Sequence, residues 1–555
     1  MQEGDDVDVV IAGGGPAGLV LAMELGQRGV STLLFDDKPG TTTQPRANAT
    51  QARTMEHYRR LGFAHEIRPL GLPVDYPTDM VCCTRLASYE LARYRRPSSK
   101  EAAEAVRQLG GSWSTPELPH RCALVYIEPV LLKHALKHAS VEIRHNWRAV
   151  RFRETADRVE VDVERVDGAE RRTARCKYFV GCEGARSMAR HQLGIKMQGE
   201  RTFEREWMAG KMHALHFRSP GLYDVMNRPR AWMYFTVNQD RRAVLACLNG
   251  TDTFVINFQL KPHEQDEDIS EVRALQMFED CLGAKLPPLE ILSTDTWNGG
   301  YMLVAERYAS GGRVFMAGDA VHLFTPTGGL GYNTAVDDVC NLGWKLAAAV
   351  QGWGGRHLLQ SYEIERRPIG LRNTGLAKIM ADRIGLYRTT PVLEADSAAG
   401  EAERKAAGDH LLDHLTKEFN IPGVTFGVRY DGSPVVVSDG TPPPPDLPNI
   451  YVPSACPGGR APHHWLPDGG GSLFDRFGRD FTLLVTAADA SAGCRFVDAA
   501  ARRRVPLTLM HLPQPELREL YAADLALIRP DQHVAWRGSA GSADPDAVLA
   551  KAVGF

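Results

Sequence analysis

The chain has 555 residues, and its 65 Lys and Arg nearly balance its 68 Asp and Glu, for a formal net charge of −3. This balance disfavours nucleic acid and an anionic membrane as partners. The sequence contains no run of about 18 apolar residues, so no membrane span is predicted. The acidic start MQEGDD lacks the basic and then apolar segments of a signal peptide, so we expect a cytoplasmic protein.

The N-terminus carries a dinucleotide-binding fingerprint. The apolar run 7–12 predicts a strand buried on both faces of a parallel sheet. The loop GGGPAG, 13–18, follows it and opens a helix that stops at Gly29. A second strand, 31–35, ends at Asp36, 18 residues past the last glycine, where a carboxylate can accept hydrogen bonds from ribose hydroxyl groups.

The glycines of this loop have separate tasks. Gly13 makes the tight turn, Gly15 lets a pyrophosphate approach the backbone, and Gly18 lets the helix pack closely on the strand. Pro16 and Ala17 complete the loop at the start of the helix. Because the loop lies between a strand and a helix with an acidic residue in place, an ordinary glycine-rich turn is a poor explanation.

The middle of the chain contains short strands and then a second glycine-rich loop. Strands are expected at 207–214, 231–237, 243–248 and 253–260, where aromatic and β-branched residues alternate with turns. Further on, 312–345 joins a strand, an acidic turn, a loop with three glycines and a helix. The first N–H groups of such a helix have no intrahelical partner, so they can face partial negative charge on a polar, electron-accepting ligand.

The last third changes in composition. The chain is expected to be helical from 367 to about 419, and the prolines of 421–448 predict a linker of polyproline character. A smaller α/β unit is expected at 449–555. The ten cysteines include no CxxC pair, so we expect no thiol–disulfide exchange, no disulfide framework and no metal site.

Four stretches together resemble the flavin-dependent aromatic hydroxylases, the p-hydroxybenzoate hydroxylase-like group of class A monooxygenases. They are the N-terminal fingerprint, PRANATQARTME at 45–56, YFVGCEGARS at 178–187 with Arg190, and GRVFMAGDA at 312–320 with the loop that follows. The resemblance implies an α/β fold: a Rossmann-like FAD-binding domain, an inserted mixed β-sheet substrate domain, and the thioredoxin-like C-terminal domain of the phenol hydroxylase branch. The implied boundaries are 1–200 and 296–420 for the FAD domain with its helices, 201–295 for the substrate domain, 421–448 for the linker and 449–555 for the last domain.

The resemblance also implies which residues contact the cofactor. These are Gly13, Gly15, Pro16, Ala17, Gly18, Asp36, Arg46, Glu183, Asp319, Pro326, Gly328, Gly329, Gly331, Tyr332 and Asn333. Four positions depart from the commonest pattern. Glu183 replaces an aspartate, Leu124 a flavin-contacting glutamine, and Leu330 and Tyr332 the usual glutamine and methionine.

The activity implied is an FAD-dependent monooxygenase reaction. In the family NADPH or NADH reduces FAD, O₂ adds at flavin C4a, and the hydroperoxide hydroxylates a phenolic or related electron-rich aromatic substrate. The substrate would lie under the inserted sheet, where Trp232, Asn257 and Phe258 are candidates for the lining, although strand aromatics often belong to a core. A polar group should activate the phenol, and we name Asn48, Tyr234 and Tyr301 as candidate catalytic residues.

Several alternatives stay open at the level of sequence. The same fold performs epoxidation or Baeyer–Villiger oxidation of polycyclic substrates. A degenerate flavin fold serving as a binding protein is an alternative from another class, disfavoured by the intact fingerprint and the Asp319 loop. No WxWxIP stretch supports a flavin halogenase. The particular aromatic substrate, the choice between NADH and NADPH, and a possible homodimer are not determined by these motifs.

Overall fold

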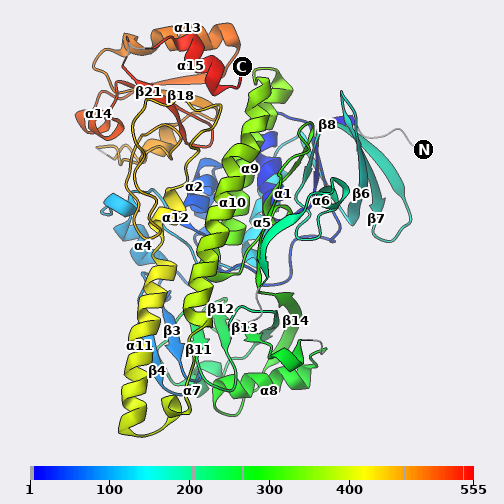
Figure 1. Cartoon of the computed structure of the whole chain (residues 1–555), viewed down its shortest axis with the longest axis vertical. Coiled ribbons are helices and arrows are strands. Elements are labelled where there is room, and N and C mark those ends of the chain that lie inside the picture. The colour runs from blue at the N-terminus through cyan, green and yellow to red at the C-terminus, as the bar shows by residue number, and fades with distance from the viewer. Residues whose placement is uncertain are drawn as a thin grey trace.

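The structure is a computed structural model and describes residues 6–201, 205, 207–265, 268–467, 469–539, 541 and 543–555. Three units are stacked along its longest axis (Figure 1). A unit built on a first sheet occupies the middle, a second sheet lies below it, and a C-terminal unit lies above. Among the described residues no helix is both long and apolar enough to cross a membrane.

The first sheet has the strand order β5-β2-β1-β8-β7-β6, with β16 also paired to β8. Its parallel strands are β1 (Asp6–Ala12), β2 (Thr32–Asp36), β5 (Val141–His145), β8 (Arg171–Gly181) and β16 (Val314–Met316). The antiparallel strands β6 (Trp147–Glu154) and β7 (Val159–Arg165) extend it. Val9, Val10 and Ile11 are fully buried, which confirms the predicted central strand.

Helices cover the first sheet. They are α1 (Pro16–Gly26), α2 (Ala52–Arg60), α3 (Ala64–Ile67), α5 (Leu124–Ala135), α6 (Met188–Gln192) and α9 (Leu330–Gln351). Where α1 crosses α9 only a glycine fits, because a Cβ at Gly343 would lie 2.5 Å from the Cβ of Glu24. Helix α5 begins at Leu124 and keeps Pro129 inside its first two turns.

The second sheet has the order β14-β10-β13-β12-β11-β3-β4. Its strands are β3 (Met80–Cys83), β4 (Glu90–Tyr94), β10 (Lys211–Arg218), β11 (Met233–Thr236), β12 (Ala243–Cys247), β13 (Thr253–Gln259) and β14 (Glu290–Asn298). The β3–β4 hairpin lies within the range 1–200 expected for the first domain, but it pairs with β11 in parallel and belongs to the second sheet. The strand predicted at 207–214 begins at Lys211, and 202–204 and 206 lie outside the described residues.

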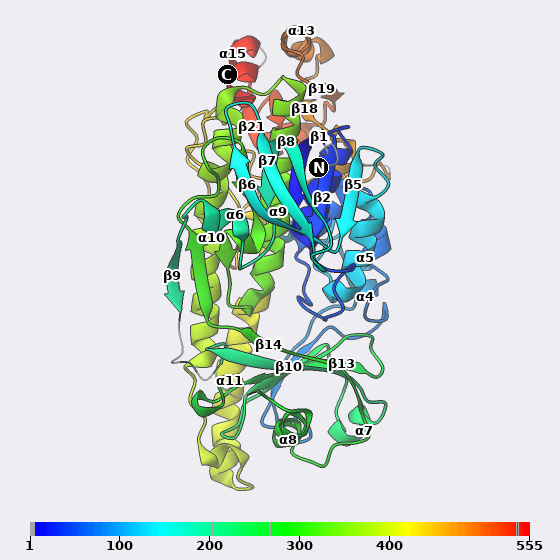
Figure 2. The same cartoon turned by 90° about the vertical axis from the view of Figure 1, so that its right-hand side faces the viewer.

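The two faces of the second sheet have different roles. The register sets Asp295, Ala214 and Asn257 side by side on one face, and this face lies below the first unit (Figure 2). The opposite face packs on α8 (Glu271–Leu282), for example through the rings of Phe258 and Phe278, whose centroids are 6.4 Å apart. Along each strand, successive side chains thus point alternately toward the first unit and into the core formed with α8.

Long helices connect the units (Figure 1). Helix α10 (Arg356–Gly385) runs beside α9 and reaches the level of the second sheet, where α11 (Ala398–Phe419) packs along β4. The continuous helix expected from 367 to about 419 is interrupted at 386–397, which contains a short 3-10 turn starting at Pro391. Proline cannot donate the backbone hydrogen bond that an uninterrupted helix needs.

The proline-rich segment is packed rather than free over most of its length. It forms the short α12 (Pro422–Phe426), and Val424, Phe426 and Tyr430 are buried. Only the stretch 438–449 around the proline run is largely exposed. The predicted linker is thus shorter than 421–448, because apolar residues between the prolines find partners on α10.

The C-terminal unit has the strand order β19-β18-β20-β21. Strands β18 (Phe481–Val485) and β19 (Leu507–His511) are parallel and joined by α13 (Cys494–Arg503), and β20 (Leu525–Ile528) and β21 (Val534–Gly538) form an antiparallel hairpin before α15 (Pro545–Ala552). This order of a βαβ unit, a hairpin and a helix is the thioredoxin-like arrangement that the resemblance implied. Shorter elements elsewhere are α4 (Ser99–Ala105), α7 (Leu222–Met226), α14 (Pro515–Tyr521), β9 (Met197–Arg201), β15 (Tyr301–Ala305) and β17 (His322–Leu323).

Candidate active site

The N-terminal glycine loop leaves room for a phosphate group at the start of α1. Gly13 has a φ of 103°, a conformation that favours glycine. A Cβ at Gly18 would lie 1.9 Å from the carbonyl oxygen of Gly13, whereas a Cβ at Gly15 would meet nothing within 4 Å. Helix α1 starts at Pro16 with no side-chain cap and no acidic residue in its first turn. Its free N–H groups therefore face open space, which suits a pyrophosphate.

Two alanine substitutions in this loop are expected to have opposite consequences. In Gly15→Ala the fold should keep its stability, because the added methyl group meets no atom, but FAD affinity should fall about tenfold or more, since the methyl group enters the phosphate space. In Gly18→Ala the clash with Gly13 should lower stability by about 1–3 kcal/mol. Thermal unfolding of the apoprotein and fluorescence titration with FAD separate the two effects. Equal affinities in Gly15→Ala and the parent protein would contradict the assignment.

Asp36 lies where the fingerprint predicts it. Its carboxylate is 5% exposed and accepts hydrogen bonds from the backbone N–H groups of Gly14, at 2.5 Å, and Lys38, at 2.7 Å. The carboxylate therefore borders the glycine loop at the end of β2. This position is compatible with the predicted ribose contact, which stays a prediction.

The second glycine loop forms a cradle, which we define as residues 326–333. Gly328 and Gly329 have φ values of 72° and 63°, so both positions favour glycine. The 22-residue helix α9 then starts without a side-chain cap and without an acidic residue in its first turn. Its first N–H groups and its dipole provide a site for partial negative charge.

Asp319 precedes the cradle in a 3-10 turn, Gly318–Ala320. The residue is exposed, and no described residue donates a hydrogen bond to its carboxylate. The chain nevertheless surrounds the carboxyl group closely enough to raise its pKa by burial, against the opposing charges of His322 and Arg46. A carboxylate with free acceptor positions beside an uncapped helix is compatible with the ribityl hydroxyl groups of a flavin, and this contact stays a prediction.

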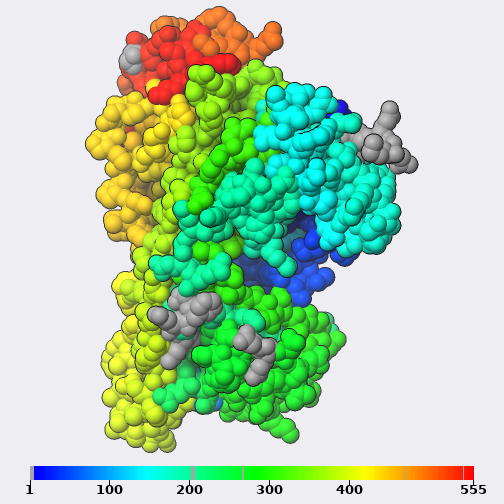
Figure 3. Space-filling model, turned by 45° about the vertical axis from the view of Figure 1, so that its right-hand side comes forward, coloured from blue at the N-terminus to red at the C-terminus, as the bar shows by residue number. Residues whose placement is uncertain are grey.

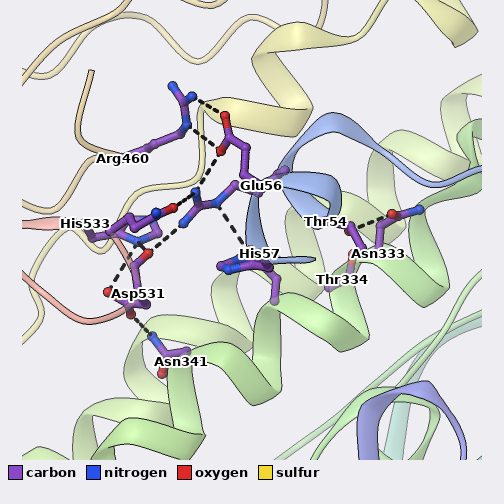
Figure 4. A network of polar contacts seen from close by, with 12 residues as sticks. Thr54, Glu56, His57, Asn333, Thr334, Asn341, Arg460, Asp531 and His533 are labelled. Carbon is purple, nitrogen blue, oxygen red and sulfur yellow. Dashed lines mark hydrogen bonds and ion pairs between the residues drawn. The ribbon is translucent and has the colours of Figure 1, made fainter. Parts of the chain in front are cut away.

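Asn333 holds the cradle together rather than facing it (Figure 4). Its Oδ1 accepts hydrogen bonds from Gln51 N at 2.8 Å and from Thr54 Oγ1 at 2.7 Å. Its Nδ2 donates to the carbonyl oxygens of Ala49, at 2.9 Å, and Gly329, at 2.6 Å. Because these contacts occupy both ends of the amide, Asn333 can offer only its backbone to the cofactor.

The two unusual cradle residues have structural partners. Leu330 is 3% exposed and packs on α10 and α12 with Met380 and Val424. The hydroxyl group of Tyr332 pairs with that of Tyr58 on α2. The replacements thus anchor the cradle to three different helices.

The second signature, with Glu183, braces the turn that carries Asp319. The Glu183 carboxylate accepts hydrogen bonds from Ser187 Oγ at 3.0 Å and Ala189 N at 2.9 Å at the start of α6, and burial raises its pKa. Arg190 donates to the carbonyl oxygen of Ala320 at 2.7 Å. Glu183 therefore caps α6 here, and its predicted role toward the cofactors stays a prediction.

A recess separates the first unit from the second sheet, and N-terminal residues coloured blue are visible at its floor (Figure 3). Arg46, with a 65% exposed side chain, spans the two units and pairs with Asp295 of β14 at 2.5 Å. Asn48 follows a left-handed residue, Ala47, with φ of 47°. Its Oδ1 is buried and accepts no hydrogen bond from the described residues. The loop 46–48 thus brings a cation and an unpaired acceptor to this region.

Tyr234 does not join Asn48. Tyr234 lies on the core face of the second sheet, opposite Leu245, is fully buried, and its hydroxyl group accepts a hydrogen bond from Ala231 N at 2.7 Å. Phe258 lies in the same core. The structure thus contradicts these two placements, because a strand's alternate residues point to opposite faces. Tyr301 lies at the start of β15 under the guanidinium of Arg201, 5.4 Å from the ring centroid.

A buried ionic network supports the cradle from behind. Arg366 donates to Asp337 Oδ2 at 3.0 Å and to Asp338 Oδ1 at 2.8 Å. Asp338 also accepts from Gly318 N at 3.2 Å, and Asp337 contacts His57 Nε2 at 2.8 Å. Figure 4 shows His57, Glu56 and Asp531 within one network of polar contacts. The turn that carries Asp319 is therefore linked to α2 and α10 through charged groups.

Stability is expected to fall in weak acid because of His57. Burial and the nearby Arg53 lower the pKa of His57 from 6.5 to about 4. Between pH 6.5 and 4 this histidine is protonated in the unfolded chain but not in the folded chain. The free energy of unfolding therefore decreases as the pH is lowered, by up to about 3 kcal/mol from this group. Thermal midpoints measured across this range should show a shallower slope in His57→Gln. An unchanged slope would contradict this origin.

These features define a flavoprotein fold. The space over Gly15, the uncapped starts of α1 and α9 and the open Asp319 fit FAD. The protein residues 6–376 match the model of the "FAD binding domain" family, and residues 454–554 match "Aromatic-ring hydroxylase, C-terminal". The chain therefore belongs to the FAD-dependent aromatic-ring hydroxylases and is an FAD-dependent monooxygenase. Bound FAD supplies electron transfer from a nicotinamide cofactor and activation of O₂.

The chain is similar to proteins of this class over its whole length. It is 29% identical to the FAD-dependent monooxygenase apdD of Emericella nidulans, over 99% of this chain and 90% of that protein. It is 28% identical to phenol 2-monooxygenase of a Pseudomonas species, over 98% of this chain and 92% of that protein. Among solved structures, RebC soaked with chromopyrrolic acid and with bound 7-carboxy-K252c has 31% identity and a TM-score of 0.88, with complete coverage of both chains.

Proposed function

We propose that the protein hydroxylates a phenolic substrate in the recess between the first unit and the second sheet, and that Asn48 orients the phenol. The observation that carries this proposal is the buried Asn48 Oδ1, which has no hydrogen-bond donor among the described residues. A buried acceptor without a partner is costly, and a phenolic hydroxyl group would supply the missing donor. Asn48 precedes Ala49, whose carbonyl oxygen binds Asn333 of the cradle.

Asn48 would hold the substrate rather than remove its proton, because an amide is not a base at neutral pH. The phenol's own acidity, or a second group, then has to account for the proton. We assign Arg46 to the cofactor side of the recess, where release from Asp295 would free its guanidinium for phosphate groups. Asp36, Glu183 and Asp319 keep the cofactor roles that the family resemblance implies.

The proposed function is tested with the purified protein. We expect a yellow protein whose oxidation of NADH or NADPH rises with a phenol from a panel of small phenols, aromatic acids and polycyclic aromatics. Hydroxylated product, measured against hydrogen peroxide, should fall in Asn48→Ala. Epoxide or lactone products would instead support epoxidation or Baeyer–Villiger oxidation, and a colourless protein without stimulated oxidation would support a binding protein.

The partners, the cellular location and the oligomeric state also belong to this proposal. The balanced charge supports small aromatic molecules rather than nucleic acid as partners. We expect the protein to work in the cytoplasm, and we infer a possible homodimer with contacts through the C-terminal unit. Size-exclusion chromatography with light scattering tests the oligomeric state.

A further inference from the structure

Arg121 is a buried cation that no described acidic group neutralises. The residue is 6% exposed, and its Nη1 is buried without a hydrogen-bond partner among the described residues. Burial lowers the pKa of Arg121 to about 9, and the neighbouring Arg96 opposes its charge further. An arginine still keeps its charge at neutral pH. Because a buried charge without a counter-charge is costly, this residue points to a ligand that supplies the missing charge.

The backbone places Arg121 beside the cradle. Thr50 and His120 exchange two backbone hydrogen bonds of 2.9 Å, so the two segments run antiparallel. This register sets Arg121 opposite Ala49, on the same side of the pair. Ala49 touches the cradle, because a Cβ added to Gly329 would lie 3.1 Å from the Cβ of Ala49.

Aromatic side chains surround the guanidinium. It lies 4.6 Å from the ring centroid of Trp232, just before β11, and 5.9 Å from that of Phe419, at the end of α11. The residue before Phe419, Glu418, accepts a hydrogen bond from Gly328 N of the cradle at 2.8 Å. Arg121 therefore lies where the second sheet, α11 and the cradle converge, with flat apolar surfaces beside its charge.

Other arginines near the second sheet have partners. Arg218 pairs with Glu290 at 2.8 Å, and Arg228 and Arg230 donate to backbone carbonyl groups. Only Arg121 combines deep burial, an unpaired nitrogen and aromatic neighbours in this group of four.

We propose, resting on the function proposed above, that Arg121 recognises an anionic oxygen of the aromatic substrate, a carboxylate or a phenolate, beside the buried ring of Trp232. A guanidinium can bind such a group through two parallel hydrogen bonds. The substrate class is then an anionic, phenol-bearing aromatic that spans the distance from Asn48 to Arg121. Arg121 acts in binding and orientation and takes no part in proton transfer.

Binding to the FAD-loaded protein tests this assignment without any need for turnover. Changes in flavin absorbance are titrated with 3-hydroxy-2-naphthoate, its carboxamide, 2-naphthoate and 2-naphthol. We expect the carboxylate to bind about tenfold tighter than the carboxamide and Arg121→Gln to abolish this preference while the carboxamide affinity stays unchanged. Loss confined to 2-naphthoate identifies a carboxylate as the anion, and loss confined to 2-naphthol identifies a phenolate.

Two further variants keep the outcome clear. Arg230→Gln removes an arginine that also stacks on a ring, that of Tyr223 at 4.6 Å, and should change no affinity. Arg121→Lys keeps the charge and should retain part of the preference even if Arg121→Gln does not fold. Equal weakening of all four ligands would overturn the assignment, as would a parent protein that binds the carboxylate no better than the carboxamide and whose affinity for 2-naphthol is unchanged in Arg121→Gln. Absence of phenol-stimulated NAD(P)H oxidation would instead overturn the proposed function. The binding titrations would still test Arg121 in that case, because they require no turnover.

Discussion

Replacing Glu56 by Gln is expected to lower the free energy of unfolding by about 3–5 kcal/mol and to loosen the C-terminal unit. The Glu56 side chain on α2 is fully buried and binds Arg460 of the C-terminal unit. It also accepts a hydrogen bond from Arg53 at 2.8 Å and one from Thr115 at 2.7 Å. Glutamine keeps the shape but leaves two buried guanidinium groups without this negative charge.

The electrostatics of Glu56 support an effect of this size. Burial by itself raises the pKa of this carboxyl group, but the opposing charges of Arg460 and Arg53 are stronger and lower it to about 2. The folded state therefore depends on ionised Glu56, and this part of the stability is lost as the pH falls from 4.5 toward 2. Arg53 in addition donates to the carbonyl oxygen of Asp531 at 2.6 Å, which gives α2 a further contact with the C-terminal unit.

Urea unfolding followed by tryptophan fluorescence, together with the FAD content of the purified protein, measures this effect. Asp546→Asn is the matched control, because its partner Arg502 has a 60% exposed side chain and exposed pairs contribute about 1 kcal/mol at most. The double variant Glu56→Gln with Arg460→Met should recover part of the loss, since it removes one unpaired charge. If Glu56→Gln and Asp546→Asn are equally stable, the network does not hold the units together.

The sequence predicted the local parts of the site correctly, because each is built from consecutive residues. The strand Val314–Met316 and the glycines at 328 and 329 occupy the expected places. Helix α9 follows these glycines, as the sequence predicted. The spacing of apolar residues and the positions of glycines are enough to predict such elements, because their hydrogen bonds join residues that are close in the sequence.

Features that depend on distant pairing were missed. The β3–β4 hairpin joins the second sheet through β11, more than a hundred residues later, and a single sequence carries no signal for that partner. Tyr234 was placed on the wrong face because its strand is buried on both faces, which removes the polar alternation that marks a side. Arg121 carries no signal in the sequence, because its defining property, the lack of a counter-charge, exists only in three dimensions.

The C-terminal unit gains a role from these contacts. Arg529 forms two hydrogen bonds with Glu365 of α10, at 2.7 and 2.9 Å, and Glu365 accepts another from Lys345 of α9 at 2.6 Å. Burial lowers the pKa of Lys345 to about 8, although Glu365 opposes the shift. The unit thus touches both long helices behind the cradle, which favours a structural part in holding the flavin site over redox chemistry of its own.

Replacing Arg366 by Met is expected to have the second large effect, a loss of at least about 3–5 kcal/mol in stability and of most bound FAD. Arg366 is fully buried and lies between the adjacent acids Asp337 and Asp338. Without it, two buried carboxylates would repel each other or take up protons. Asp338 would then loosen its hydrogen bond to Gly318 N, at 3.2 Å, which positions the turn that carries Asp319.

Two further variants separate the loss of charge from the loss of flavin binding. Arg367→Gln changes the neighbouring, partly exposed residue of α10, which donates to the carbonyl oxygen of Ala305 at 3.0 Å, and should cost less than about 1 kcal/mol. Asp338→Asn removes one of the two acids while Arg366 stays, so its main consequence should be weaker FAD binding through the Gly318 turn. FAD dissociation constants from fluorescence titration and urea unfolding of each apoprotein measure both quantities. A stable Arg366→Met protein with full FAD content would show that the two acids do not need this counter-charge, and the link from α10 to the flavin turn would have to be abandoned.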